Sequence, residues 1–375
     1  MRVLFVSKPI VPPWNDGSKC LVRDVASHLT VAEPTVMVAP AGPSLGPRVR
    51  REPVYGASAR FAPTDNALVL NRLLFGDPLD IWHFVFAPNA ASSSAAQLAI
   101  RARRAGGWKG KVVQTVASRP KSFGPDSERR GELGSRGIQA LFFGDRIVAL
   151  SEWMRVRLLR ARVRDSIVRV IPPCADDPTV KEPAALVRER YELGSGPVIL
   201  YPGDLHVSSG ASMVAAAASE VLRTVPGARL VFACRPKGHD LEEREAGLRA
   251  ALSGLDPFVR ILGEVDDMPS LIAAADVVAF PAEDLYGKVD LPIVLLEAMA
   301  LGRPLALVTG GPLEELPGVH VPPGDAPALA RALIELCQDR ALRAHHGAES
   351  RTAWERKFTP EIVAAQHDAL YSELC

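Results

Sequence analysis

The stretch DVVAFPAEDLYGKVDLPIVLLEAMALGRPLALV, residues 276–308, predicts a strand, a polar loop, a helix and a second strand. Residues 276–280 form a short apolar run with β-branched side chains, which favours a buried strand. The polar loop that follows carries Glu283, Asp284, Lys288 and Asp290. The helix is predicted to begin near Pro292, because proline lacks the amide hydrogen that would have no partner in a first helical turn. A tight turn at Gly302 leads into the next strand.

The same alternation of strand and helix recurs along the chain, for example after RVLFV (2–6) and PVILY (197–201). Such alternation predicts parallel sheets covered by helices on both faces. The polar, proline-containing stretch 172–185 precedes a fresh series, so we expect a hinge near Asp176 between two Rossmann-like domains. The predicted segments are residues 1–175, residues 176–355, and a C-terminal helix at 356–375 that crosses back to the N-terminal domain.

The composition is that of a soluble globular protein, with 47% apolar and 23% charged residues among 375. The sequence has neither an apolar run of about 18 residues nor a signal peptide, so we expect a cytoplasmic protein. Its five scattered cysteines form no CxxC pair and predict neither disulfides nor a zinc site. The formal charge is +11 over residues 1–180 and −10 over the remainder. This division fits two domains with different partners, or compositional drift alone.

The loop VPPWNDGSK, residues 11–19, is long for a connection between a strand and a helix, which usually takes about 2 to 6 residues. Gly17 would permit close approach of the backbone to a ligand, and Asp16 or Ser18 would cap the helix. The loop is therefore a candidate binding loop, although the same residues also make an ordinary turn and cap.

Residues 276–308 resemble the C-terminal signature of the family 4-like (group 1) glycosyltransferases, E-x-F-G-L-x-x-x-E-A-M-A-x-G-x-P. The resemblance continues in the family's order through DRIVALSEWMRVRLL (145–159), ILYPGD (199–204) and GGPLEEL (310–316). It implies a GT-B fold, in which two Rossmann-like domains place parallel sheets across a central cleft. The N-terminal domain would bind the acceptor, and the C-terminal domain would bind a nucleoside diphosphate sugar. No cofactor and no obligatory metal are implied.

The resemblance assigns donor residues position by position. Glu297 occupies the place of the glutamate that holds the ribose hydroxyls, although a glutamate there could also cap a backbone or pair with an arginine. The place of the family's first glutamate is taken by Val289, so its neighbour Asp290 is the candidate for the donor sugar unless it is a solvated loop acid. Leu291, Pro292 and Ile293 would line the donor site with it.

The diphosphate motif departs from the family. The usual G-R-L-x-x-x-K-G is replaced by GDLHVSSG (203–210), so Gly203 is followed by Asp204, and Ser209 replaces the lysine. Without cations, the charge that develops on the leaving diphosphate lacks its main stabiliser. Arg235, Lys237 and Lys288 could compensate, or they could be merely solvated and the enzyme impaired.

On the acceptor side, the family places its glycine-containing loop near the donor phosphates and the acceptor, which implies roles for Asn15, Asp16, Gly17, Ser18 and Lys19. His83, in DIWHFVFAPN (80–89), resembles a histidine that points toward sugar or acceptor; a half-buried, satisfied histidine is the alternative. The family's later histidine is absent, and Arg119 follows its position.

Basic residues at 101–104 and 151–164 could form a face for anionic lipid headgroups or remain solvated. The sequence has no nucleic-acid recognition motif, so we expect no nucleic-acid partner.

The resemblance predicts a metal-independent hexosyltransferase-like enzyme that transfers sugar to a hydroxyl acceptor with retention of configuration. The alternatives are a catalytically impaired nucleotide-sugar-binding protein, or a partner subunit of a glycosyltransferase. A nucleotide-sugar epimerase is a further rival, which the C-terminal signature disfavours.

Overall fold

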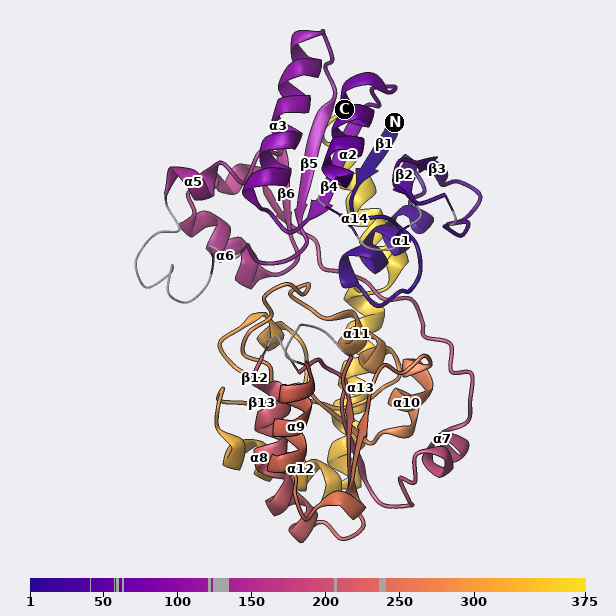
Figure 1. Ribbon diagram of the computed structural model, residues 1–375, viewed down its shortest axis with the longest axis vertical. Helices are drawn as coiled ribbons and strands as arrows, with labels where there is room; N and C mark the ends of the chain where they lie inside the picture. Colours follow the sequence, from indigo (N-terminus) through magenta and orange to yellow (C-terminus); the bar gives the residue numbers. More distant parts are fainter. Residues whose placement is uncertain are drawn as a thin grey trace. The chain divides into compact units, whose positions relative to one another are not determined.

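The computed structural model describes residues 1–40, 42–56, 58, 61–62, 64–120, 123, 135–205, 208–235 and 241–375. The chain divides into two compact units, each built around a parallel sheet (Figure 1). The first unit comprises Met1–Ala175, Tyr286–Ile293 and Phe358–Cys375, and the second comprises Asp176–Leu285 and Val294–Lys357. The predicted α/β architecture with two parallel sheets is confirmed.

The sheet of the first unit has the order β3-β2-β1-β4-β5-β6-β7. Its strands are β1 (Arg2–Val6), β2 (Glu33–Val38), β3 (Arg50–Pro53), β4 (Ile81–Phe86), β5 (Lys111–Val116), β6 (Arg146–Ala149) and β7 (Val168–Val170). Its α-helices are α1 (Gly17–His28), α2 (Asp65–Phe75), α3 (Ala90–Ala105), α5 (Arg136–Gln139), α6 (Glu152–Arg160) and α14 (Pro360–Ser372).

The sheet of the second unit has the order β10-β9-β8-β11-β12-β13. Its strands are β8 (Val198–Tyr201), β9 (Arg229–Ala233), β10 (Val259–Leu262), β11 (Val277–Ala279), β12 (Leu305–Val308) and β13 (Val319–Val321). Its helices are α7 (Ala184–Arg190), α8 (Gly210–Thr224), α9 (Leu241–Ala251), α10 (Met268–Ala274), α12 (Ala326–Gln338) and α13 (Arg340–Lys357), together with α11 (Ile293–Ala300), which begins at the last residue of the first unit.

The two faces of the first sheet carry different cores, because successive side chains of a strand point to opposite faces. On one face, Phe5 and Val85 pack in a cluster with Tyr371 of α14. On the other face, Trp82 and Phe84 pack in a cluster with side chains of α2 and α3. Both faces of β4 are therefore buried.

The C-terminal helix α14 lies against α1, although the two are far apart in sequence (Figure 1). Its Asp368 is 4% exposed and accepts hydrogen bonds from the backbone amides of Thr30, Val31 and Ala32, at 2.8, 3.0 and 2.8 Å. A carboxylate that accepts several amides makes strong, charge-assisted bonds. The chain after α1 is thus fixed by a residue some 340 positions away.

The segment Tyr286–Ile293 belongs to the first unit, whereas the sequence assigned it to a continuous C-terminal domain at 176–355. Its Val289 is 5% exposed and packs in the same core cluster as Leu21 and Val22 of α1. Burial of the Val289 side chain in this core removes its apolar surface from water, which explains why the segment belongs to the first unit.

Candidate functional site

The carboxyl edge of the second sheet brings Gly203, Asp204 and Arg235 together. Asp204 follows β8 and Arg235 follows β9, and the two residues form an isolated parallel β-bridge. A Cβ added at Gly203 would lie 2.3 Å from the ring of Tyr201, so only glycine fits there. Asp204 is 1% exposed, whereas Arg235 is half-buried. The backbone of Arg235 therefore pairs with the position at which the family carries its arginine.

The N-terminus of α8 is already bound by a carboxylate. Ser209 is the N-cap of α8, and both its amide and its hydroxyl donate to Glu283, at 3.2 and 2.6 Å. A negative charge is favourable at the positive end of a helix dipole, which is also where phosphates bind. A diphosphate at this helix end would have to displace Glu283 or tolerate its charge.

Glu297 lies on α11, whose residues 295, 296 and 298–300 are all buried. Glu297 itself is half-buried and is the one acidic residue of this helix. A carboxylate can accept two hydroxyl hydrogen bonds, which suits a vicinal diol such as ribose.

The predicted binding loop of the first unit forms an internal network. Asp16 is the N-cap of α1, accepts from the hydroxyl and amide of Ser18 at 2.6 and 3.0 Å, and accepts from Nζ of Lys8 at 2.7 Å. Burial raises the pKa of Asp16, but the Lys8 ammonium and these hydrogen bonds outweigh it and hold that pKa well below the usual value. Of the two capping residues that the sequence suggested, Asp16 is the N-cap, and Ser18 donates to it.

The remaining residues of the loop divide between core and surface. Lys19 is 6% exposed, donates to the carbonyl of Val11 at 3.2 Å, and has its pKa lowered by burial. A Cβ added at Gly17 would lie 2.9 Å from Cγ2 of Val289. The close approach predicted for this glycine is thus to the segment Tyr286–Ile293. Asn15 is exposed.

Asp290 does not lie in a solvated loop. It is 2% exposed, and its carboxylate accepts a hydrogen bond of 2.6 Å from the hydroxyl of Ser151, which in turn caps α6 by accepting from the amide of Met154 at 3.0 Å. The residues around it range from buried to half-buried: Lys288, Leu291, Pro292 and Ile293. Asp290 therefore orients a helix cap, which does not fit the predicted direct role at the donor sugar.

His83 does not reach a ligand surface, and its predicted role is corrected. The side chain is 1% exposed, with Nδ1 2.6 Å from the hydroxyl of Tyr371 and Nε2 2.7 Å from that of Thr115. Burial, followed by the neighbouring His367, lowers the pKa of His83 well below its usual value. His83 is a satisfied core histidine because its position in β4 faces α14.

Two predicted residues add little to the described site. Arg119 is half-buried after β5, and Lys237 lies outside the described residues. Two arginines of the predicted basic face form ion pairs, Arg155 with Asp165 and Arg104 with Asp145, both at 2.8 Å. Membrane contact through this face stays a prediction.

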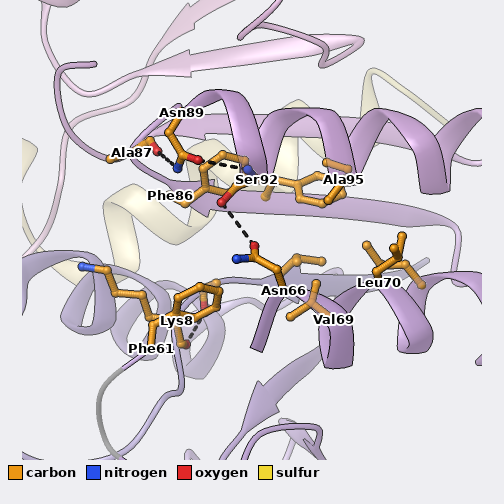
Figure 2. A pocket seen from close by; sticks show the side chains of 15 residues that line it. Lys8, Phe61, Asn66, Val69, Leu70, Phe86, Ala87, Asn89, Ser92 and Ala95 are labelled. Atoms are coloured by element: carbon orange, nitrogen blue, oxygen red, sulfur yellow. Dashed lines mark hydrogen bonds between the residues drawn. The ribbon is translucent and has the colours of Figure 1, made fainter. Parts of the chain in front are cut away.

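The first unit also contains a cavity between α2 and α3 that no sequence pattern predicted (Figure 2). Phe84 and Phe86 line it from β4, on the opposite side from His83. The apolar run IWHFVF gives no alternation that would have identified this face.

Among the described residues, no group of three or more His, Cys, Asp or Glu side chains is arranged to hold a metal ion. Within the same residues, no helix is both long enough and apolar enough to cross a membrane.

Comparisons with known proteins agree with this architecture. Residues 196–339 match the family model of the group 1 glycosyl transferases. The HepE protein of Anabaena, solved in complex with UDP-glucose, superposes with a TM-score of 0.75 at 18% identity, over 100% of both chains. At that identity the likeness shows the fold. The predicted resemblance is confirmed for residues 196–339, which match the group 1 glycosyl transferases and lie in the second unit apart from residues 286–293, and the fold is GT-B.

Two curated relatives match part of the chain. An alpha-D-kanosaminyltransferase of Streptomyces kanamyceticus is 28% identical over 51% of this chain and 49% of its own length. A GDP-mannose-dependent monoacylated alpha-(1-6)-phosphatidylinositol monomannoside mannosyltransferase of Corynebacterium glutamicum is 32% identical over 44% of this chain and 45% of its own length. The chain thus matches about half the length of these relatives.

Proposed function

We propose that this protein transfers a sugar from a nucleoside diphosphate sugar to a hydroxyl acceptor, with retention of anomeric configuration and without a metal ion. Glu297 carries the proposal. It is a half-buried carboxylate on an otherwise buried stretch of helix, inside the region that matches the family model. The UDP-glucose of the HepE structure and the GDP-mannose dependence of the Corynebacterium enzyme support a nucleoside diphosphate sugar as donor.

The proposed reaction needs positioning and charge stabilisation more than a protein base. The bond from the anomeric carbon to the diphosphate breaks, and the acceptor oxygen bonds to the same face of that carbon. The acceptor's proton passes to the departing phosphate oxygen. Arg235 would stabilise the charge on that phosphate. Asp204 stands where the family has its arginine, and Arg235 pairs with Asp204 through the backbone. Lys237 and Lys288 remain candidates for the same task.

The test is a thermal-shift screen against UDP, GDP, ADP and dTDP and their sugars, because a ligand that binds only the folded state raises the melting temperature. We expect one nucleotide to shift the wild type. Glu297→Gln should lose that shift, whereas Glu335→Gln, at an exposed position of α12, should keep it. Retention of the shift in Glu297→Gln would remove the basis of the proposal.

Turnover is tested with the donor that binds. Arg235→Ala should lower kcat about 100-fold or more while Arg235→Lys keeps part of it, since a single charge-stabilising group is worth roughly that much in related chemistry. The anomeric configuration of the product, measured by NMR, tests retention, and a chelator tests metal independence.

A second candidate function is a nucleotide-sugar-binding protein or partner subunit without its own turnover. The contact of Glu283 with the N-terminus of α8, together with buried Asp204, favours it, because both place negative charge near the family's diphosphate position. Nucleotide binding that depends on Glu297, with no sugar transfer to any acceptor, would identify this alternative.

A further inference from the structure

The first unit contains a partly open cavity of about 170 Å³, lined by α2, α3 and the carboxyl ends of β1 and β4 (Figure 2). In open α/β sheets, ligands bind beyond the carboxyl ends of the strands. The cavity lies at that edge, and nothing in the proposed chemistry of the donor uses it.

Most of the cavity wall is apolar. It is formed by Phe61, Val69, Leu70, Leu73, Phe84 and Phe86. Other aromatic rings pack against the phenylalanines of the wall. The ring of Phe84 packs edge-on against Phe143 at 5.2 Å, and Phe86 stacks on Phe143 at 6.2 Å. Tyr55 packs against Phe61 and donates its hydroxyl to the carbonyl of Ser7. The apolar surface is therefore preformed.

Polar side chains line the cavity from two places: Ser7 and Lys8 follow β1, and Asn66, Asn89 and Ser92 come from α2 and the start of α3. Asn66 on α2 and Ser92 on α3 face each other, with the Ser92 hydroxyl 3.4 Å from Oδ1 of Asn66 (Figure 2). Asn89 caps α3 by accepting from the amide of Ser92 at 2.9 Å and donates to the carbonyl of Ala87 at 3.1 Å. These amides and the hydroxyl can exchange hydrogen bonds with a ligand hydroxyl.

Resting on the proposed sugar transfer, we infer that this cavity binds the acceptor, and that the acceptor is an alcohol with one compact apolar ring, aromatic or alicyclic. An apolar cavity of about 150 Å³ is known to hold one benzene molecule, so the size fits a single ring. A free monosaccharide carries hydroxyls all round, and those against the phenylalanine wall would lose their hydrogen bonds. A long acyl chain exceeds the volume, so most of it would extend out of the cavity into water.

The test measures binding of small alcohols to the full chain by ligand-observed NMR, in the absence of donor. The probes are benzyl alcohol and cyclohexylmethanol, methyl glucoside as the polar comparison, and a series of n-alkanols from butanol to octanol. We expect both ring alcohols to bind. Methyl glucoside should not bind, and affinity among the alkanols should stop rising at about six carbons, where the cavity is full.

Ala95 lines the cavity from α3, and Ala95→Phe would fill it. This variant should bind the ring alcohols about tenfold more weakly, or not at all, because its own ring takes their space. Ala91→Phe, at an exposed position of the same helix, is the matched control and should bind as the wild type does. Ala95→Leu replaces Ala95→Phe if the larger side chain lowers the melting temperature.

Ring-alcohol binding that survives in Ala95→Phe would overturn the inference, as would binding of methyl glucoside alone or of no probe at all. An affinity that keeps rising to octanol would point to an acyl chain and also overturn it. Because the nucleotide screen with Glu297→Gln is independent of these probes, the failure of this inference and the failure of the proposed function are distinguishable.

Discussion

The first unit and the second unit use their predicted ligand-binding residues differently. In the first unit, Asp290, His83 and Lys19 are 2%, 1% and 6% exposed, and each has a partner within the unit. In the second unit, Glu297 and Arg235 are half-buried and keep part of their surface. The comparison teaches that a polar residue type alone does not predict a ligand-binding side chain, because the core of the first unit buries three of the side chains predicted to bind ligand.

Among the predictions that test how tightly the first unit uses its polar side chains, the largest loss of stability is expected from substitution of Asp368. Asp368→Ala leaves three backbone amides without their carboxylate, and we expect a loss of about 3 kcal/mol in the free energy of unfolding. Urea denaturation measures it. Gln366→Ala, at an exposed position of the same helix, should change stability by less than about 0.5 kcal/mol. Equal effects of the two substitutions would contradict the docking role of Asp368.

The next largest effect distinguishes a structural role of Asp290 from a ligand-binding role. Asp290→Ala removes the acceptor of the Ser151 hydroxyl, and we expect a loss of about 2 kcal/mol in unfolding free energy. In a double-mutant cycle with Ser151→Ala the two losses should not add, because the residues share one bond. Asp284→Ala, in the same loop, is the control. Unchanged stability with lost donor binding would restore the role predicted from the sequence.

A pH dependence of smaller size is expected from the buried histidines. Burial lowers the pKa of His367 from 6.5 to about 4, and burial also lowers that of His83. Between those pH values the unfolded chain binds protons that the folded chain does not, so stability is full above pH 6.5 and falls as the pH drops toward 4. The slope is at most about 1.4 kcal/mol per pH unit for each histidine.

Urea midpoints measured from pH 7 to pH 4.5 test this slope. His367→Gln should flatten it, whereas His345→Gln, whose side chain is 65% exposed, should leave it unchanged. A stability that rises on acidification would show that these histidines are charged in the folded state.

The smallest effect sharpens the comparison from the side of the second unit. Glu283→Gln keeps a hydrogen-bond acceptor for Ser209 but removes a negative charge from the N-terminus of α8. We expect this variant to bind the nucleoside diphosphate a few-fold more tightly than the wild type, and the difference in affinity should decrease at high salt. Calorimetric titration measures it, with Glu242→Gln on α9 as control. Weaker binding would indicate that Glu283 contacts the ligand directly.

Local pattern predicted the parallel sheets, because apolar runs such as PVILY and RLVFA record burial on both faces of a strand. Because such runs are apolar at almost every position, they do not indicate which face of the sheet each side chain points to. Nothing in IWHFVF distinguishes His83, which meets α14, from Phe84 and Phe86, which line the cavity. The family resemblance of DIWHFVFAPN therefore suggested the histidine, and the phenylalanines were missed.

The sequence by itself determined the two-sheet α/β class, because that class depends on short-range patterns and an ordered set of motifs; the same motifs predicted Glu297 as a donor residue. Only the tertiary structure decided that Val289 and Asp290 pack in the first unit, that Asp368 fixes the backbone at Thr30 to Ala32, and that α2 and α3 enclose a cavity. These features depend on contacts between residues far apart in the chain. Such contacts are selected by the burial of apolar surface and the satisfaction of buried polar groups, which no local pattern records.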